Sequence, residues 1–178
     1  KNKIYLVFEF METDLSKIIS SKQPLLVEHV LYLVVQILNG LNALHCSGII
    51  HRDLKPANIL VNTDCKLKLA DFGLSCGIDE NNVTPPEYVV TRWYRPPEIL
   101  LECSSNQKID IWSLGCIFVE LINRKPLFPG SDSLNQIKKI LEFYIEIKDS
   151  DASFLGEEKY KKLKTMFPKL EKNNKHFL

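Results

Sequence analysis

One short stretch of the sequence combines residue types that suit phosphoryl transfer. Residues 51–58 read His-Arg-Asp-Leu-Lys-Pro-Ala-Asn, and residues 71–73 read Asp-Phe-Gly. Moving a phosphoryl group asks a protein mainly to position a polyphosphate and to neutralise its oxygens. Asp53 can orient an attacking hydroxyl and accept its proton, and Lys55 can meet the phosphate as a compact cation. These residues therefore predict phosphoryl transfer.

Two further polar residues, Asn58 and Asp71, are candidate ligands for a metal ion. Magnesium prefers hard oxygen ligands, keeps several waters and needs only one or two protein groups beside substrate phosphates. The sequence between them predicts two short strands, at residues 59–61 and 67–69, joined by a polar turn. Such a hairpin would bring Asn58 and Asp71 to adjacent strand ends, where they could share magnesium.

The His-Arg-Asp and Asp-Phe-Gly motifs together resemble the signature set of the protein kinases. The match includes the five-residue step from Asp53 to Asn58. Taken singly, Asp53 or Asp71 is better explained as a carboxylate in a turn or helix cap. The resemblance implies a protein-kinase-like fold, α+β overall, of which this chain is mainly the α-helical C-terminal lobe with short β-hairpins. It also implies ATP and Mg²⁺ as cofactors, bound with the help of Lys55, Asn58 and Asp71.

Two other segments resemble the mitogen-activated protein (MAP) kinases. Residues 11–15 read Met-Glu-Thr-Asp-Leu, and residues 91–95 read Thr-Arg-Trp-Tyr-Arg. The resemblance implies an ATP-dependent, proline-directed serine/threonine kinase that acts on protein substrates with Ser/Thr-Pro sites and is switched on by an upstream activating kinase. One alternative is a cyclin-dependent-type kinase, although such kinases usually carry leucine in place of Arg92. The other alternative is a non-catalytic kinase-like scaffold.

The resemblance assigns the adenine and ribose contacts to the hinge and to one strand. Phe8 corresponds to the gatekeeper residue. The backbone carbonyl of Glu9 and the N–H of Met11 are implied to face adenine. Asp14 is implied to lie near the ribose, and Leu60 beneath the adenine ring.

The polar segment that follows the Asp-Phe-Gly motif has no periodicity, and the resemblance identifies it as the activation segment. Tyr88 precedes Arg92 and Arg95 by four and seven residues. A phosphate on Tyr88 could therefore form charge-assisted contacts with both guanidinium groups. We predict that this is the main activating event, and that it orders Thr91, the substrate-positioning residue, toward Asp53.

This segment departs from the MAP kinases at one phosphorylation site. Their Thr-x-Tyr pair would place threonine at position 86, where this chain has Pro86. Arg52 is, by resemblance, the partner of the phosphate that Pro86 cannot carry. We predict that Thr84 is only a secondary site, because the two prolines that follow it stiffen its approach.

Apolar patterning predicts the elements that position these residues. Residues 3–8 are β-branched and aromatic, which predicts a strand, and Thr13 or Asp14 can cap a short helix that ends near residue 21. Residues 25–46 predict a long helix, and Gly48 suits the left-handed position beyond its end. The predicted apolar face of the long helix comprises Val27, Val30, Leu31, Val34, Leu38, Leu41 and Leu44.

A second long helix is predicted at residues 109–122, which are apolar almost all the way round, so it is expected to be buried on every side. Asp110 would then be a buried carboxylate that needs partners. The resemblance implies that it holds the backbone of the catalytic loop. Glu98 corresponds to a supporting glutamate that normally pairs with a later arginine, which is not identifiable in this sequence. A loop at 126–130 and a helix at 131–144 complete the predicted elements.

The composition is that of a soluble globular domain, with 178 residues of which 45% are hydrophobic and a formal net charge of +1. This charge gives no general attraction to nucleic acid or anionic membrane, and we find no long apolar span, so neither partner is expected. The five cysteines lack metal-ligand spacing and favour a reducing compartment, cytoplasmic and/or nuclear. The first stretch lacks the cleavage pattern of a signal peptide.

The long predicted helix also carries candidate docking residues. His29 and Tyr32 are expected to face solvent or to pack at an edge of the domain. In MAP kinases the corresponding face lines a docking groove for peptides, together with the loop around Cys65.

We assign the whole chain to one partial kinase domain from which the small N-terminal lobe is absent. The glycine-rich loop and the strand lysine of that lobe are not found, so the chain by itself is expected to hold a triphosphate from one side only and to be inactive. The parts are a hinge at about 3–15, a large lobe at about 16–145 and a divergent lysine-rich segment at 146–178. The lysine run is expected to be a solvated helix face.

Overall fold

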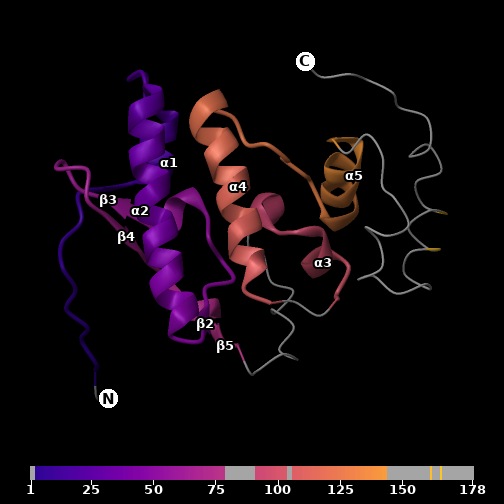
Figure 1. Ribbon diagram of the computed structural model, residues 1–178, viewed down its shortest axis with the longest axis horizontal. Helices are drawn as coiled ribbons and strands as arrows, with labels where there is room; N and C mark the ends of the chain where they lie inside the picture. Colours follow the sequence, from indigo (N-terminus) through magenta and orange to yellow (C-terminus); the bar gives the residue numbers. More distant parts are fainter. Residues whose placement is uncertain (1–2, 79–90, 104–105, 144–160, 162–164, 166–178) are drawn as a thin grey trace.

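The computed structural model describes residues 3–78, 91–103, 106–143, 161 and 165. This part of the chain is mainly helical, with two small antiparallel sheets, which is the mixture that the sequence predicted (Figure 1). The helices are α1 (Leu15–Ser20), α2 (Val27–Cys46), α3 (Pro97–Leu100), α4 (Lys108–Asn123) and α5 (Ser133–Phe143). Three short 3-10 turns are η1 (Pro56–Asn58), η2 (Phe72–Leu74) and η3 (Arg92–Tyr94).

The larger sheet carries the ends of the two motifs. Its strands are β1 (Thr13–Asp14), β3 (Ile59–Val61) and β4 (Leu67–Leu69), all antiparallel in the order β1-β3-β4. The β3–β4 hairpin is as predicted, and its open end is closed by a hydrogen bond from the N–H of Ala70 to the carbonyl of Asn58, 2.9 Å long. Asp71 therefore follows directly after the residue that pairs with Asn58. A second ribbon pairs β2 (Ile49–Ile50) with β5 (Cys76–Gly77).

The hydrophobic core lies between α2 and α4, which run side by side (Figure 1). α2 contributes Val30, Leu33, Ile37 and Leu41, whose spacing of three and four residues places them on one helical face. From α4, Leu114, Ile117 and Leu121 are buried in the same cluster. Full burial of a side chain of this size favours folding by about 1.5–3 kcal/mol. The α2–α4 pair is therefore a main source of stability in the described structure.

Helix α1 is fixed at both ends by polar contacts. Asp14 caps its start, because the Asp14 carboxylate accepts the N–H of Lys17 at 3.1 Å. Arg124, which ends α4 with a left-handed φ of 57°, donates from its guanidinium to the carbonyls of Ile18 at 2.7 Å and Ile19 at 2.9 Å. These are carbonyls of the last turn of α1, which lack partners inside the helix. Arg124 therefore ties α1 to the end of α4.

The predicted strand at residues 3–8 is wrong. These residues have no regular secondary structure and pair with no strand in the described part of the chain. Val7 is 94% exposed and Phe8 81% exposed. A strand is stabilised by hydrogen bonds and side-chain contacts to its neighbours, so β-branched residues alone do not form one.

The predicted burial of the two long helices needs correction. In α4, Ile111 and Ile122 are about half exposed, at 47% and 57%, so the helix is not buried on every side within the described structure. In α2, the predicted face included Val27, Leu31 and Leu38, all of which are exposed. Residues of both helices are apolar over a wider arc than their packing partners cover.

Helix α2 also meets the length and composition of a membrane-spanning helix, with a mean hydropathy of 1.3 over its most apolar stretch. The sequence-based reading that the chain has no long apolar span is therefore wrong for α2. In the structure α2 packs along α4 and β4 and supplies four residues to the core. Length and composition do not by themselves distinguish such a core helix from a spanning one.

Candidate active site

The loop at residues 51–58, identified above by resemblance as the catalytic loop, is held by Asp110 at the start of α4. One carboxylate oxygen of Asp110 accepts the backbone N–H of His51, and the other accepts that of Arg52, both at 2.9 Å. The imidazole Nε2 of His45 lies 2.8 Å from the first of these oxygens. Asp110 is fully buried, and a buried carboxylate persists only with such partners. These contacts join Asp110 to the backbone that it was predicted to support.

His51 connects the two motifs to each other. Its Nδ1 accepts the backbone N–H of Asp53 at 3.3 Å, and its Nε2 lies 3.1 Å from the carbonyl of Ala70. The first contact requires an unprotonated Nδ1 and the second a proton on Nε2, so one neutral tautomer satisfies both. The ring also packs against Phe72, with centroids 5.1 Å apart. The sequence motif contained His51, but sequence reasoning assigned it no role of its own.

Two of the predicted catalytic residues, Lys55 and Asn58, contact the carboxylate of a third, Asp53. The Nζ of Lys55 lies 2.6 Å from Oδ2 of Asp53. The side-chain amide of Asn58 donates to the same oxygen at 3.1 Å and to the backbone carbonyl of Asp53 at 2.9 Å. Both side chains of the ion pair are mostly buried. Asp53 is thereby fixed in position, and its charge is balanced by a cation that can also face a phosphate.

The residues predicted to bind metal offer suitable oxygen atoms. The Nδ2 of Asn58 faces Asp53, which leaves its Oδ1 directed elsewhere and without a hydrogen bond in the described structure. Asp71 has a left-handed φ of 65°, and its Oδ1 accepts the N–H of Gly73 in a weak 3.4 Å contact. Amide and carboxylate oxygens on adjacent strand ends suit a hard cation. The donor set therefore fits magnesium.

The nucleotide residues predicted in the hinge differ in how firmly they are held. Phe8 is exposed, and Glu9 forms an ion pair with Lys68. Met11 is half-buried, whereas Asp14 caps α1 and lies opposite Leu60 in the sheet. Burial alone would raise the pKa of the Asp14 carboxyl, but hydrogen bonds from Ser16 and Lys17 outweigh burial and lower this pKa.

Glu12 joins the predicted hinge to the β3–β4 turn, a contact that sequence reasoning missed. Its carboxylate accepts the N–H of Thr63 at 3.0 Å and the hydroxyl of Thr63 at 3.1 Å. The N–H of Glu12 donates to the side chain of Asn62 at 3.2 Å. Thr63 lies 51 residues after Glu12, so no local spacing in the sequence indicates this contact. This contact fixes the backbone beside Met11.

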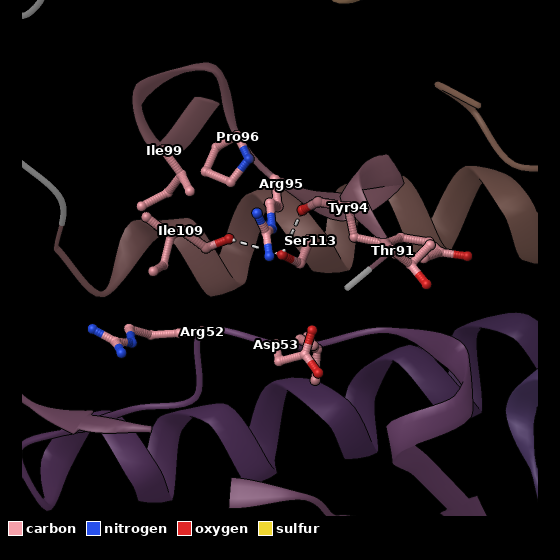
Figure 2. Close-up of a pocket in the computed structure, with 10 residues that line it drawn as sticks. Arg52, Asp53, Thr91, Tyr94, Arg95, Pro96, Ile99, Ile109 and Ser113 are labelled. Atoms are coloured by element: carbon pink, nitrogen blue, oxygen red, sulfur yellow. Dashed lines mark hydrogen bonds between the residues drawn. The ribbon is translucent and has the colours of Figure 1, made fainter. Parts of the chain in front are cut away.

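A pocket lies between the catalytic loop and the segment that carries η3 (Figure 2). Arg52 and Asp53 form one wall, and Thr91 and Arg95 belong to the other. Thr91 and Asp53 therefore line the same pocket. The hydroxyl of Ser113 on α4 lies 2.8 Å from the carbonyl of Tyr94, which holds this segment against the helix.

The two arginines predicted to bind a phosphate are close enough to influence each other. Burial lowers the pKa of the half-buried Arg95 guanidinium, the charge of Arg92 lowers it further, and Asp53 acts in the opposite direction. The Nε of Arg52 donates to the carbonyl of Leu74 at 2.6 Å, so it joins the loop to η2. The predicted phosphorylation sites, Tyr88 and Thr84, lie outside the described residues.

Two glutamates, the buried Glu120 and the partly buried Glu98, have raised pKa values. The hydroxyl of Tyr94 donates to Glu120 at 2.7 Å, and burial raises the pKa values of both groups. Burial also raises the pKa of Glu98 on α3. Among the described residues, no cation pairs with the Glu98 carboxylate. The arginine partner that the sequence did not identify is therefore not found in this part of the structure either.

The candidate docking residues share one side of the domain. His29 is exposed, with its Nδ1 accepting the N–H of Leu26 at 3.2 Å, and Tyr32 is 53% exposed on the next turn of α2. Gln36, one turn further, donates to the carbonyl of Cys65 at 2.9 Å and accepts the N–H of Leu67 at 3.2 Å. Gln36 thus joins this face of α2 to the Cys65 loop.

Comparison with known proteins agrees with this geometry. The chain matches the protein kinase domain family over residues 1–178. It is 50% identical to mitogen-activated protein kinase 4 of Oryza sativa subsp. japonica over 165 residues, which are 92% of this chain and 45% of that protein. It is 52% identical to mitogen-activated protein kinase 4a of Physcomitrium patens over 155 residues, which are 86% of this chain and 41% of that protein. The chain spans about half the length of the curated relatives it matches.

Proposed function

We propose that this chain, which belongs to the protein kinase domain family, supplies the hinge and large lobe of a MAP-kinase-like serine/threonine kinase. The observation that carries the proposal is the cluster in which Lys55 and Asn58 both contact the Asp53 carboxylate. Such a cluster combines a proton acceptor, a cation and an amide at the distances that phosphoryl transfer requires. The similarity to plant MAP kinases supports this subfamily.

In the proposed reaction, a serine or threonine hydroxyl attacks the γ-phosphorus of ATP. A bond forms between the hydroxyl oxygen and phosphorus, the bond to the leaving ADP oxygen breaks, and the hydroxyl proton passes to Asp53. Lys55 neutralises charge on the transferred group. Magnesium, held by Asn58 and Asp71, would supply charge neutralisation on the phosphate oxygens. His51 and Asp110 act on this chemistry by fixing the backbone around Asp53.

The direct test is transfer of γ-labelled phosphate from ATP to peptides by the full-length natural protein. We expect Asp53→Asn to lower kcat by about 10²–10⁴-fold, because the base and its charge are lost. We expect Asp71→Ala to abolish magnesium-dependent transfer more completely. Asp64→Ala, an exposed carboxylate in the β3–β4 turn, is the matched control and should remain active. Near-parental activity of both site variants would refute the assignment.

We propose that substrate choice is proline-directed, because the sequence of residues 91–95 resembles the corresponding segment of MAP kinases. In a peptide library, activity should fall sharply when the proline that follows the target serine or threonine becomes alanine. Equal activity on both peptides would argue for another subfamily. Phosphate on Tyr88 would engage Arg92 and Arg95, and an upstream kinase would place it there.

The proposed partners follow from the exposed docking residues. A docking peptide that binds the α2 face would contact His29 and Tyr32 and reach the Cys65 loop. We propose that such peptides come from substrates or from the activating kinase, and that the protein acts in the cytoplasm, the nucleus or both. Substituting His29 and Tyr32 together by alanine should weaken phosphorylation of a protein substrate more than that of a short peptide, and an equal loss on both would exclude a docking role.

A further inference from the structure

A fully buried amide on α5 belongs to a closed set of hydrogen bonds that the proposed reaction does not use. Gln136 has no exposed surface. Its Oε1 accepts the N–H of Gly130 at 2.9 Å, and its Nε2 donates to the carbonyl of Trp93 at 3.3 Å. The indole Nε1 of Trp93 donates to the carbonyl of Gly130 at 3.0 Å. We call these three residues the Gln136 triangle.

Position 130 admits only glycine if the triangle is to form. A Cβ at Gly130 would lie 2.4 Å from Oε1 of Gln136 and 2.6 Å from its Cα. The second clash is with backbone and cannot be relieved by turning a side chain. The loop before α5 therefore lies in direct contact with the first turn of that helix. This contact places Gln136 within hydrogen-bond distance of the Trp93 carbonyl.

The triangle constrains the wall of the pocket opposite the catalytic loop. Trp93 is the central residue of η3, and its neighbours Thr91 and Arg95 line the pocket that Asp53 shares. Figure 2 shows Thr91 and Arg95 on the wall that faces Asp53. The same wall is held from behind by α4, through Tyr94 and Glu120. It is thus fixed from two sides, by α4 at Tyr94 and by α5 at Trp93.

We propose that Gln136 is a positioning residue for the protein substrate, which sets the conformation of residues 91–95 and thereby the fit of the peptide beside Asp53. The inference rests on the proposed kinase function and deepens it. Gln136 does not touch the reacting atoms. It acts because a buried donor and acceptor must both be satisfied, and only an amide of this length satisfies Trp93 and Gly130 together.

The first experiment measures steady-state kinetics with the full-length natural protein. Gln136→Met keeps the length and loses both hydrogen bonds, so the KM for a Ser-Pro peptide should rise about tenfold, the scale set by losing such bonds. The KM for ATP should change less than about twofold, because the hinge lies elsewhere. Gln136→Glu keeps the acceptor for Gly130 but sets a buried carboxylate oxygen against the Trp93 carbonyl, so it should raise the peptide KM at least as much as Gln136→Met. Gln23→Ala, which removes an exposed amide, is the matched control.

The second experiment reads the triangle without any catalysis. The chain has two tryptophans, so Trp112→Phe leaves Trp93 as the sole indole. In that background, Gln136→Met should increase quenching of the Trp93 fluorescence by acrylamide, because the indole loses its fixed partner. Gly130→Ala displaces the same contacts from the other side and should give the same increase in quenching and in peptide KM.

The outcomes separate the two proposals. If the parental protein transfers phosphate to no peptide, the proposed function fails, while the fluorescence still reports whether Gln136 orders Trp93. If the parental protein is active and Gln136→Met changes neither peptide KM nor quenching, the positioning role is wrong. Equal increases of both KM values, with a lower midpoint of unfolding, would show a purely structural role and would also overturn it. A selective rise in peptide KM with increased quenching supports it.

Discussion

The ammonium group of Lys55 lies 2.6 Å from the carboxylate of Asp53, two residues earlier in the chain. The intervening residue, Leu54, is buried in the core, so the two polar side chains emerge on the same side of an extended stretch. The side chains are 18% and 11% exposed. In this setting, a charge interaction is screened less than at an open surface. The pair therefore places a cation directly beside the carboxylate that lines the pocket.

Replacing Lys55 tests whether that cation acts on the transferred phosphate. We expect Lys55→Met in the full-length natural protein to lower kcat by about 10²–10³-fold, the usual effect of removing one charge-stabilising group. The control is Lys66→Met, because Lys66 pairs with Asp64 at an exposed turn. Steady-state kinetics check the prediction. A loss seen only in the KM for ATP would show that Lys55 contributes to binding alone.

Replacing Asp110 tests the suspension of the catalytic loop. Asp110→Ala would leave the buried N–H groups of His51 and Arg52 without acceptors, at about 1–3 kcal/mol for each group. We expect the free energy of unfolding to fall by about 2–6 kcal/mol. Asp110→Asn should be intermediate between the parent and Asp110→Ala, because it keeps one acceptor oxygen. Urea unfolding measures this. An unfolding midpoint unchanged from the parent would contradict the role given to Asp110.

Glu98 predicts a dependence of stability on pH. Burial raises the pKa of this carboxyl above its ordinary value near 4.5. The folded state therefore holds the proton more tightly than the unfolded state, and the associated stability is complete below the unfolded-state pKa and is lost as pH rises through the folded-state pKa. Glu98→Gln cannot ionise. We expect the variant to be more stable than the parent at pH 7, and this advantage to shrink toward pH 4.

Unfolding of this chain in urea at both pH values measures the difference. Glu142→Gln, at the exposed end of α5, is the control and should show no such trend. If the Glu98→Gln advantage is the same at pH 4 and pH 7, the carboxyl is not destabilised by burial.

Arg124 predicts a contribution to stability that does not involve catalysis. Its guanidinium satisfies the carbonyls of Ile18, Ile19 and Gln23. Hydrogen bonds with a charged partner contribute about 1.5–3 kcal/mol, so Arg124→Ala should lower the free energy of unfolding by about 2–3 kcal/mol. Lys125→Ala, the neighbouring exposed cation, should cost much less. Equal effects of the two substitutions in thermal or urea unfolding would exclude the proposed clamp.

Tyr88 predicts the regulatory behaviour of the complete protein. We expect Tyr88→Phe to remove most activation by an upstream kinase, because no phosphate remains to engage Arg92 and Arg95. Thr84→Ala should have the smaller effect. Activity after treatment with an activating kinase provides the measurement. Full activity of Tyr88→Phe, or complete loss in Thr84→Ala alone, would reverse this order of the two sites.

The sequence by itself determined which residues form the candidate site and the local elements that carry them. The spacing of Asp53, Lys55 and Asn58 is short, so their side chains meet wherever the loop is ordered. The β3–β4 hairpin and α2 were also predicted, because turns and helical periodicity depend on neighbours a few residues away. Asp110 was predicted to be buried because the residues around it are apolar.

Only the tertiary structure decided which distant groups meet. Asp110 and His45 are 65 residues apart, Glu12 and Thr63 51 residues, and Gln136 and Trp93 43 residues. No periodicity links such pairs, because each partner is chosen by how the helices and loops pack. The same reason explains the errors: residues 3–8 have strand composition but no neighbouring strand in the described structure, and the buried faces of α2 and α4 depend on where their partners lie. Residue type determines which contacts a side chain can make, and packing determines which of them form.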